Sequence, residues 1–188
     1  MDYIVSKGLK NRTSRPYYGQ DMECTPEDSL RAIGQALVSQ EEEANDEITA
    51  QIKGYQTLPS NQARPLMESL LGGPVAISAA ASDWMFYESG IFDSCSRDAV
   101  VNHAVVLVGY GGQPGSKYWT VQNSWGPSWG ERGFIRVFRQ DTPEEESAFC
   151  GTDDRPEDGI ECKPYPESVQ VCGMCAILYD SVVPTFKA

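Results

Sequence analysis

One histidine and one asparagine are the residues whose types and spacing could support catalysis. His103, the only histidine, begins the run HAVVLVGY, and Asn123 ends the run KYWTVQN, 20 residues further along the chain. A neutral imidazole has distinct nitrogens, and a partner on one of them fixes which proton the other can exchange. A histidine that an asparagine orients can therefore act as the general base for a nucleophile.

The two runs are expected to form one antiparallel β-hairpin. The residues between them are rich in glycine, serine and proline, and strands joined by so short a loop pair with each other. We expect Tyr110 to lie opposite Lys117. With that register, His103 falls opposite Ser124 or, after a one-residue slip, opposite Asn123. The hairpin therefore predicts that the histidine and the asparagine are neighbours.

Trp125 and Trp129 follow Asn123 in the stretch NSWGPSWG and would cover this pair. We expect the Asn123 carbonyl to accept a hydrogen bond from Nδ1–H of His103, which leaves Nε2 for the nucleophile. Indoles above the bond would exclude water and strengthen it. For each residue alone, a structural histidine or an asparagine that merely ends a strand is the alternative interpretation.

A histidine–asparagine pair requires a cysteine nucleophile, because a thiolate can be held beside an imidazolium without a buried carboxylate. None of the cysteines lies at the start of a helix in a glycine-serine-cysteine-tryptophan context, and each is typical of a disulfide half. They are Cys24, Cys95, Cys150, Cys162, Cys172 and Cys175. The residues therefore leave the nucleophile of this pair unassigned.

Composition and charge exclude several classes of function. Lys and Arg total 15 against 27 Asp and Glu, a net charge of -12, which argues against nucleic-acid binding. No stretch approaches the roughly 18 apolar residues of a membrane span. No metal or cofactor is expected, because the acidic run DRPEDG (154–159) lacks the ligand spacing of a calcium loop. The cysteines and the glycosylation candidate Asn11 indicate a secreted history, although the first residues do not resemble a signal peptide.

Hydrophobic periodicity predicts a mixed helix and strand protein. Helices are expected at residues 1–9, 25–40 and 64–71, strands at 48–58, 74–80, 104–110, 117–123, 133–139 and 175–183, a loop at 11–24, a solvated acidic edge at 41–47, and a long, tied-down loop at 141–171.

Four segments resemble the papain-like cysteine proteases. VNHAVVLVGYG (101–111) is similar to their histidine strand, and YWTVQNSWGPSWGERGFIRV (118–137) to their asparagine-tryptophan segment. GPVAISAAASDWMFYESGIFDSC (73–95) and CAILYDSVVP (175–184) match in order and spacing. The resemblance implies an α+β fold. Residues 48–188 would form the right-hand β-barrel domain, and residues 1–47 a remnant of the helical left-hand domain with an acidic spacer.

The resemblance also implies roles for individual residues. His103 would be the general base and ion-pair partner, Asn123 its orienter, and Trp125 its shield. The substrate cleft would be flanked by Val101, Asn102 and Ala104. Cys95 would pair with Cys175 and Cys24 with an upstream cysteine, which leaves Cys150, Cys162 and Cys172 without an assigned partner. The spacer between residues 24 and 48 and the acidic segment 141–171 exceed the lengths usual in this family.

The implied function is hydrolysis of peptide bonds in peptide or protein substrates by a thiol peptidase of which this chain is the C-terminal part. The chain alone is then expected to be inactive, monomeric, and lysosomal, vacuolar or extracellular. One alternative is a truncated, inactive homologue that binds peptides or a protease. Another is a disulfide-tied extracellular domain in which Trp125 and Trp129 pack into a core away from His103.

Overall fold

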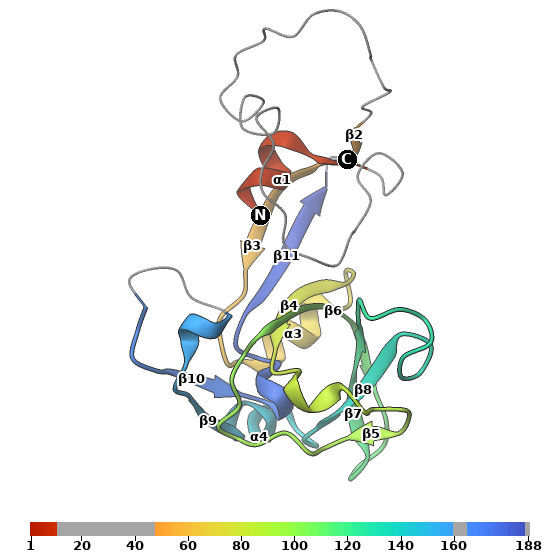
Figure 1. The fold of residues 1–188 in the computed structure, drawn as a ribbon, viewed down its shortest axis with the longest axis vertical. Helices are drawn as coiled ribbons and strands as arrows, with labels where there is room; N and C mark the ends of the chain where they lie inside the picture. The colour runs from red at the N-terminus through yellow and green to blue at the C-terminus, as the bar shows by residue number, and fades with distance from the viewer. Residues whose placement is uncertain (11–47, 160–164, 187–188) are drawn as a thin grey trace, which may run out of the picture. The chain divides into compact units, whose positions relative to one another are not determined.

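The structure is a computed structural model that describes residues 1–10, 48–159 and 165–186 (Figure 1). The expected loop at 11–24, helix at 25–40 and acidic edge at 41–47 lie outside the described residues, as do Asn11, Cys24 and Cys162. The chain divides into two compact units, Met1–Gly54 with Phe186–Ala188, and Tyr55–Thr185. The division into domains at residue 48 stays a prediction.

The first unit begins with the expected helix. Helix α1 (Asp2–Lys7) ends at Gly8, whose φ of 72° and N–H bond to the Ile4 carbonyl are those of a glycine that terminates a helix. Strand β1 (Leu9–Lys10) then pairs antiparallel with β2 (Ile48–Ala50). The unit also contains the start of β3 (Ile52–Thr57), so the strand expected at 48–58 forms in two pieces.

A seven-stranded sheet has the order β3-β11-β4-β6-β7-β8-β5 (Figure 1). From β11 to β8 the neighbours are antiparallel, and β5 is parallel to β8. The remaining strands are β4 (Val75–Ala79), β5 (Ile91–Phe92), β6 (His103–Gly111), β7 (Lys117–Gln122), β8 (Phe134–Arg139) and β11 (Ser181–Phe186). The strands predicted in the middle of the chain are confirmed, and the protein is α+β.

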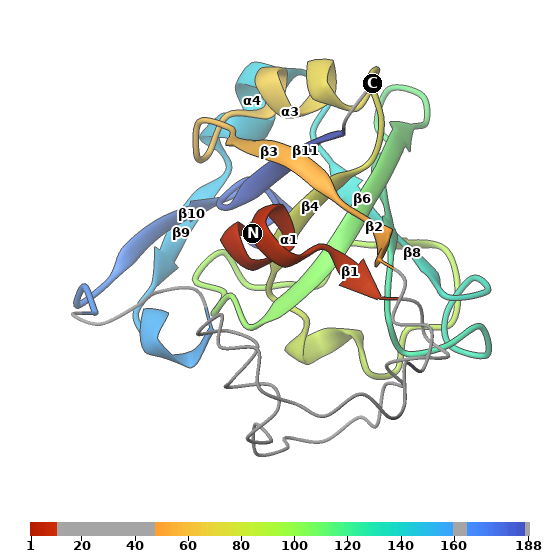
Figure 2. The same cartoon turned by 90° about the horizontal axis from the view of Figure 1, so that it is seen from above.

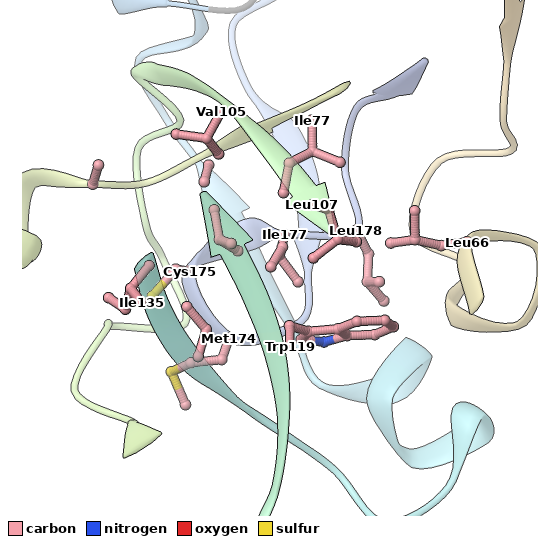
Figure 3. Close-up of a cluster of buried hydrophobic side chains, with 14 of the residues drawn as sticks. Leu66, Ile77, Val105, Leu107, Trp119, Ile135, Met174, Cys175, Ile177 and Leu178 are labelled. Carbon is pink, nitrogen blue, oxygen red and sulfur yellow. The ribbon is translucent and has the colours of Figure 1, made fainter. Parts of the chain in front are cut away.

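The core of the second unit lies against alternate residues of these strands. Trp119 and Val121 of β7 are buried, as are Ile135 and Val137 of the neighbouring β8, while the residues between them are more exposed. Figure 3 shows Trp119 and Ile135 converging with Leu66, Leu107, Ile177 and Leu178. Period-two alternation is what a sheet with one buried face requires.

Two short helices lie side by side at one side of this core (Figure 2). Helix α3 (Ala63–Ser69) confirms the helix predicted at 64–71. Its first residue, Ala63, donates its backbone N–H to the Ser147 hydroxyl of α4 (Pro143–Ala148) at 3.0 Å. The two helices therefore connect residues 63–69 with the acidic segment far along the chain.

The prediction of a loop at 141–171 was wrong. The segment forms α4, strand β9 (Cys150–Asp153), the 3-10 helix η2 (Pro156–Asp158) and strand β10 (Val169–Cys172), and β9 and β10 make a separate antiparallel pair. Thr142 and Glu145 form a capping box that starts α4. The motif was readable in the sequence, but the acidic, proline-bearing composition concealed it.

The strand expected at 175–183 begins later than predicted. Residues Met174–Ala176 form a buried 3-10 turn, η3, and β11 begins only at Ser181. Cys175 and Ala176 have φ values of 57° and 58°, a left-handed conformation that interrupts any strand. The apolar run CAIL is therefore buried as a turn, and its periodicity could not distinguish the two states.

Candidate active site

The β6–β7 hairpin brings His103 and Asn123 together, but with a different register from the one predicted. Tyr110 lies opposite Trp119 rather than Lys117, a shift of two residues. An irregularity between Leu107 and Gly109 then removes one residue of that shift, so that Val106 lies opposite Gln122. A bulge is a tertiary feature that counting from the turn cannot foresee.

His103 and Asn123 are joined by a hydrogen bond. Nε2 of His103 lies 2.9 Å from Oδ1 of Asn123, so the ring donates Nε2–H to the amide carbonyl. The expected Nδ1 contact was therefore wrong, because ring orientation depends on side-chain torsions that the register does not determine. Nδ1 is the nitrogen left for a proton exchange.

Asn123 is held rigidly for this contact. Only 8% of the residue is exposed, and its backbone N–H donates to the Gly133 carbonyl at 2.9 Å. The same Oδ1 also accepts the backbone N–H of Ser124 at 2.7 Å. An acceptor that is fixed by the backbone holds the imidazole without adding a charge.

The two indoles form a cover over the pair. The rings of His103 and Trp125 have centroids 5.2 Å apart, and the Trp125 ring meets Trp129 edge-on at 5.1 Å. Trp129 is anchored in turn, since its Nε1–H donates to the Trp84 carbonyl at 3.2 Å. The alternative in which both indoles pack away from His103 is contradicted, because Trp125 contacts the imidazole.

The turn that carries the indoles is secured by an ion pair that the sequence analysis did not single out. Glu131 accepts two hydrogen bonds from the Arg136 guanidinium, at 2.6 and 2.8 Å, and one from the Gly90 N–H at 2.9 Å. The Arg136 hydrogen bonds hold the pKa of Glu131 below its usual value despite some burial. The sequence signal that could have predicted this ion pair was the presence of Glu131 and Arg136 five residues apart on either side of a turn.

The three residues predicted to flank the cleft have different environments. Val101 is completely buried with Val171 and Ala176, whereas the side chain of Ala104 is exposed. Asn102 accepts the Ala81 N–H at 3.0 Å and donates to the Ser82 hydroxyl at 2.8 Å. Substrate binding by these residues stays a prediction, and for Val101 it could involve only the main chain.

Comparison with known proteins identifies the family of this site. Residues 1–157 match the family model described as papain family cysteine protease. The chain belongs to this family. The bromelain protease from Ananas comosus, solved in complex with an inhibitor, superposes with a TM-score of 0.65 and 27% sequence identity, covering 99% of this chain and 67% of that chain.

Curated papain-family relatives are substantially longer than this chain. The KDEL-tailed cysteine endopeptidase CEP2 of Arabidopsis thaliana is 37% identical over 73% of this chain and 34% of its own length. Vignain of Vigna mungo is 35% identical over 80% of this chain and 37% of its own length. Cathepsin K of Mus musculus is 34% identical over 70% of this chain and 36% of its own length. The chain thus spans about a third of each.

Every cysteine of this papain-family chain that the structure describes is in a disulfide. One bond joins Cys95 to Cys175, the pair that the resemblance implies. A second joins Cys150 to Cys172, which the sequence left without an assigned partner. Among residues 1–10, 48–159 and 165–186 there is therefore no free thiol to face Nδ1 of His103.

The same described ranges contain no group of acidic, histidine or cysteine side chains that could hold a metal ion. They also contain no helix long and apolar enough to cross a membrane.

Proposed function

We propose that the chain is the C-terminal portion of a papain-type cysteine peptidase that hydrolyses peptide bonds through a thiolate–imidazolium pair. His103 is the base and acid, and Asn123 orients it. The observation that carries this proposal is the 2.9 Å hydrogen bond between the two residues beneath Trp125. Family membership supports the chemistry, since a papain-family model matches residues 1–157.

The proposed reaction uses the ring nitrogen that Asn123 leaves unoccupied. Nδ1 of His103 takes the proton of a cysteine thiol, and the resulting thiolate attacks the carbonyl carbon of a peptide. The carbon–nitrogen bond breaks as Nδ1–H protonates the leaving amine, which gives a thioester. Water then attacks the thioester while His103 accepts its proton, and the thiol is released with the acid.

The Nε2–H bond to Asn123 contributes at both stages. It keeps the proton on Nε2 in the neutral ring, so that Nδ1 is free to accept, and it stabilises the imidazolium that forms. The cover by Trp125 excludes water and so strengthens this bond. Because 41% of Trp125 remains exposed, the outer face of the indole is also available to a substrate.

The nucleophilic cysteine in this proposal lies on a segment outside the chain. The four described cysteines are in disulfides, and Cys175 is completely buried. The proposed partners are a preceding segment with the cysteine and a peptide or protein substrate, and we expect the chain alone to be inactive. A lysosomal, vacuolar or extracellular address fits the two disulfides, which form in oxidising compartments.

The first test is to sequence the transcript upstream of the Met1 codon and to assay both proteins. An in-frame segment with a glycine-serine-cysteine-tryptophan motif supports the enzyme, whereas a stop codon favours an inactive binding module. The 188-residue chain alone should neither cleave a peptide nor react stoichiometrically with a thiol-directed epoxide. Turnover or stoichiometric labelling of the chain alone would overturn the proposal.

The second test uses substitutions in the longer protein. His103→Ala should lower kcat/KM by about 10²- to 10⁴-fold, the contribution typical of general acid–base catalysis. Asn123→Ala should lower it by about 10- to 100-fold, as expected for a group that orients a catalytic residue. Asn61→Ala is the control, because Asn61 also makes side-chain hydrogen bonds but to the Gln170 and Cys172 backbone.

A further inference from the structure

The β9 segment, defined as residues 149–159, lies directly against the backbone that leads into His103. A Cβ atom added to Gly151 would lie 2.1 Å from the Arg97 carbonyl oxygen. One added to Gly159 would lie 2.4 Å from the Val101 carbonyl oxygen and 2.8 Å from the Asn102 Cα. The β9 segment and residues 97–102 thus pack backbone against backbone at both ends of residues 97–102, with no room for a side chain at either glycine.

Between these glycines, the buried carboxylate of Asp153 connects the β9 segment to residues 97–102. Asp153 is completely buried, and its Oδ2 accepts the backbone N–H of Val101 at 3.0 Å. Its Oδ1 accepts the Arg155 N–H at 2.9 Å, so both oxygens have a partner. Burying a carboxylate is unfavourable unless its oxygens are hydrogen-bonded, and here backbone groups provide those bonds.

Further contacts hold the same stretch from its other end. The Thr152 N–H donates to Oδ1 of Asp98 at 2.8 Å. The Arg97 guanidinium lies over the Phe149 ring, 4.3 Å from its centroid. The β9 segment therefore contacts both ends of residues 97–102.

The first residues of β6 have no ladder partner on the side that faces β7. On one side His103 is opposite Ala79 of β4, so the ladder reaches the histidine. On the other side the ladder to β7 begins only at Val106, which lies opposite Gln122. His103 thus has backbone pairing on one side only, and the preceding Val101 is held by Asp153.

We infer that Asp153 is a positioning residue. By holding Val101, two residues before His103, it keeps the start of β6 where the imidazole reaches Asn123. Its importance for catalysis rests on the proposed function, but the positioning itself does not.

The test observes His103 directly, because it is the only histidine in the chain. The 188-residue protein is labelled with ¹⁵N-histidine, and the exchange rate of the Nε2–H proton with water is measured by NMR. In Asp153→Ala this rate should rise by about tenfold, the factor expected when a protecting hydrogen bond is weakened. The Nε2 chemical shift should move toward that of a solvated ring.

Gly159→Ala is a second, independent probe. Its methyl group would push on the Val101 carbonyl without removing Asp153, and Gly159 has a φ of -164°, which any residue can adopt. Exchange at Nε2 should increase here as well. If Asp153→Ala does not fold, this variant still tests whether the contact with Val101 positions His103.

Glu145→Ala is the matched control. Glu145 also belongs to the acidic segment and accepts a hydrogen bond from backbone, at the Thr142 N–H, but this bond lies at the start of α4 and not on residues 97–102. It should lower the melting temperature while leaving Nε2–H exchange unchanged. The inference is overturned if Asp153→Ala and Gly159→Ala also lower the melting temperature with no change at Nε2.

A kinetic measurement separates this inference from the proposed function. In the longer, active protein Asp153→Ala should lower kcat by about 10- to 100-fold, as misplacement of a catalytic group does, with KM within about twofold. If the longer protein has no peptidase activity, the proposed function fails. The NMR result on His103 still decides the positioning role.

Discussion

The β6–β7 hairpin and the acidic segment between β8 and β10 both contribute to the site, but different interactions stabilise them. The hairpin has a ladder with one irregularity and contributes buried Leu107, Trp119 and Val121 to the core. The acidic segment contributes a disulfide, two buried carboxylates and close backbone packing. The hairpin is thus stabilised by apolar burial, and the acidic segment by specific polar and covalent contacts.

Each region depends on the other through one buried hydrogen bond. Glu146 of α4 is 1% exposed, and its Oε1 accepts the indole N–H of Trp119 in β7 at 2.9 Å. Its Oε2 accepts the Gln140 N–H at 2.7 Å. A carboxylate from the acidic segment therefore satisfies the one polar atom of the largest core residue in the hairpin. The variants below test how separable the two regions are.

Leu107→Ala should have the largest effect on stability. Leu107 is completely buried in the core, and such a truncation costs about 2–5 kcal/mol of unfolding free energy. Urea denaturation measures the loss. Val106→Ala on the same strand is the control, since 38% of Val106 is exposed, and it should cost less than about 1 kcal/mol. Equal losses from both would show that burial does not dominate in the hairpin.

Replacing Cys150 and Cys172 by serine should reduce stability by about 3 kcal/mol, the value for a closed loop of this length. The two cysteines are 22 residues apart and directly opposite each other in β9 and β10. Amide exchange should accelerate most in β9 and β10 and least in β6 and β7. Uniform acceleration across all four strands would show that the two regions unfold as one.

Glu146→Gln tests the connection between the regions through its pH dependence. Burial raises the pKa of Glu146 above 4.5, while the hydrogen bonds from Trp119 and Gln140 and the charge of Arg139 oppose that shift. Between the pKa of Glu146 in the unfolded chain and its higher pKa in the folded chain, the folded chain binds more protons. The free energy of unfolding therefore falls as pH rises through this range.

The variant should be less stable than the wild type by about 1–2 kcal/mol at pH 4.5, because an amide has a single acceptor oxygen for the two donors. The difference in stability between the variant and the wild type should become smaller as pH rises, because only the wild type acquires a buried charge. Melting temperatures between pH 4 and 7 measure it. A gap that widens with pH would show that Glu146 is stabilised in its ionised form.

Arg64→Ala should have the smallest effect. Arg64 of α3 pairs with Glu144 of α4, but the two side chains are 63% and 68% exposed. Exposed ion pairs contribute little to stability, because water and salt screen their charges. Thermal denaturation at low and high salt should differ little from that of the wild type. A loss comparable to that of Glu146→Gln would show that the helix pair, rather than the buried carboxylate, connects the acidic segment to the core.

Much of the site could be predicted because its determinants are local. The hairpin followed from two alternating runs around a glycine-rich turn, and it placed His103 beside Asn123. The register was mispredicted because the strands already pair Gly111 with Tyr118 beside the turn, and the bonding nitrogen of His103 was mispredicted because a ring torsion decides it. The acidic segment was mispredicted because β9 (CGTD) has no apolar alternation and β10 (VQVC) has only four residues. The two strands pair although residues 154–168 separate them in the sequence.

The alternation of the sheet strands, the identity of the histidine–asparagine pair and its aromatic cover could all be read from the amino-acid sequence. These depend on residue type and short-range spacing, which hydrophobic burial converts into structure. Only the tertiary structure decided that Nε2 contacts Asn123, that Cys150 bonds to Cys172, and that Asp153 holds Val101. Those contacts join residues from separate elements, and their geometry exists only after the core has placed the elements against each other.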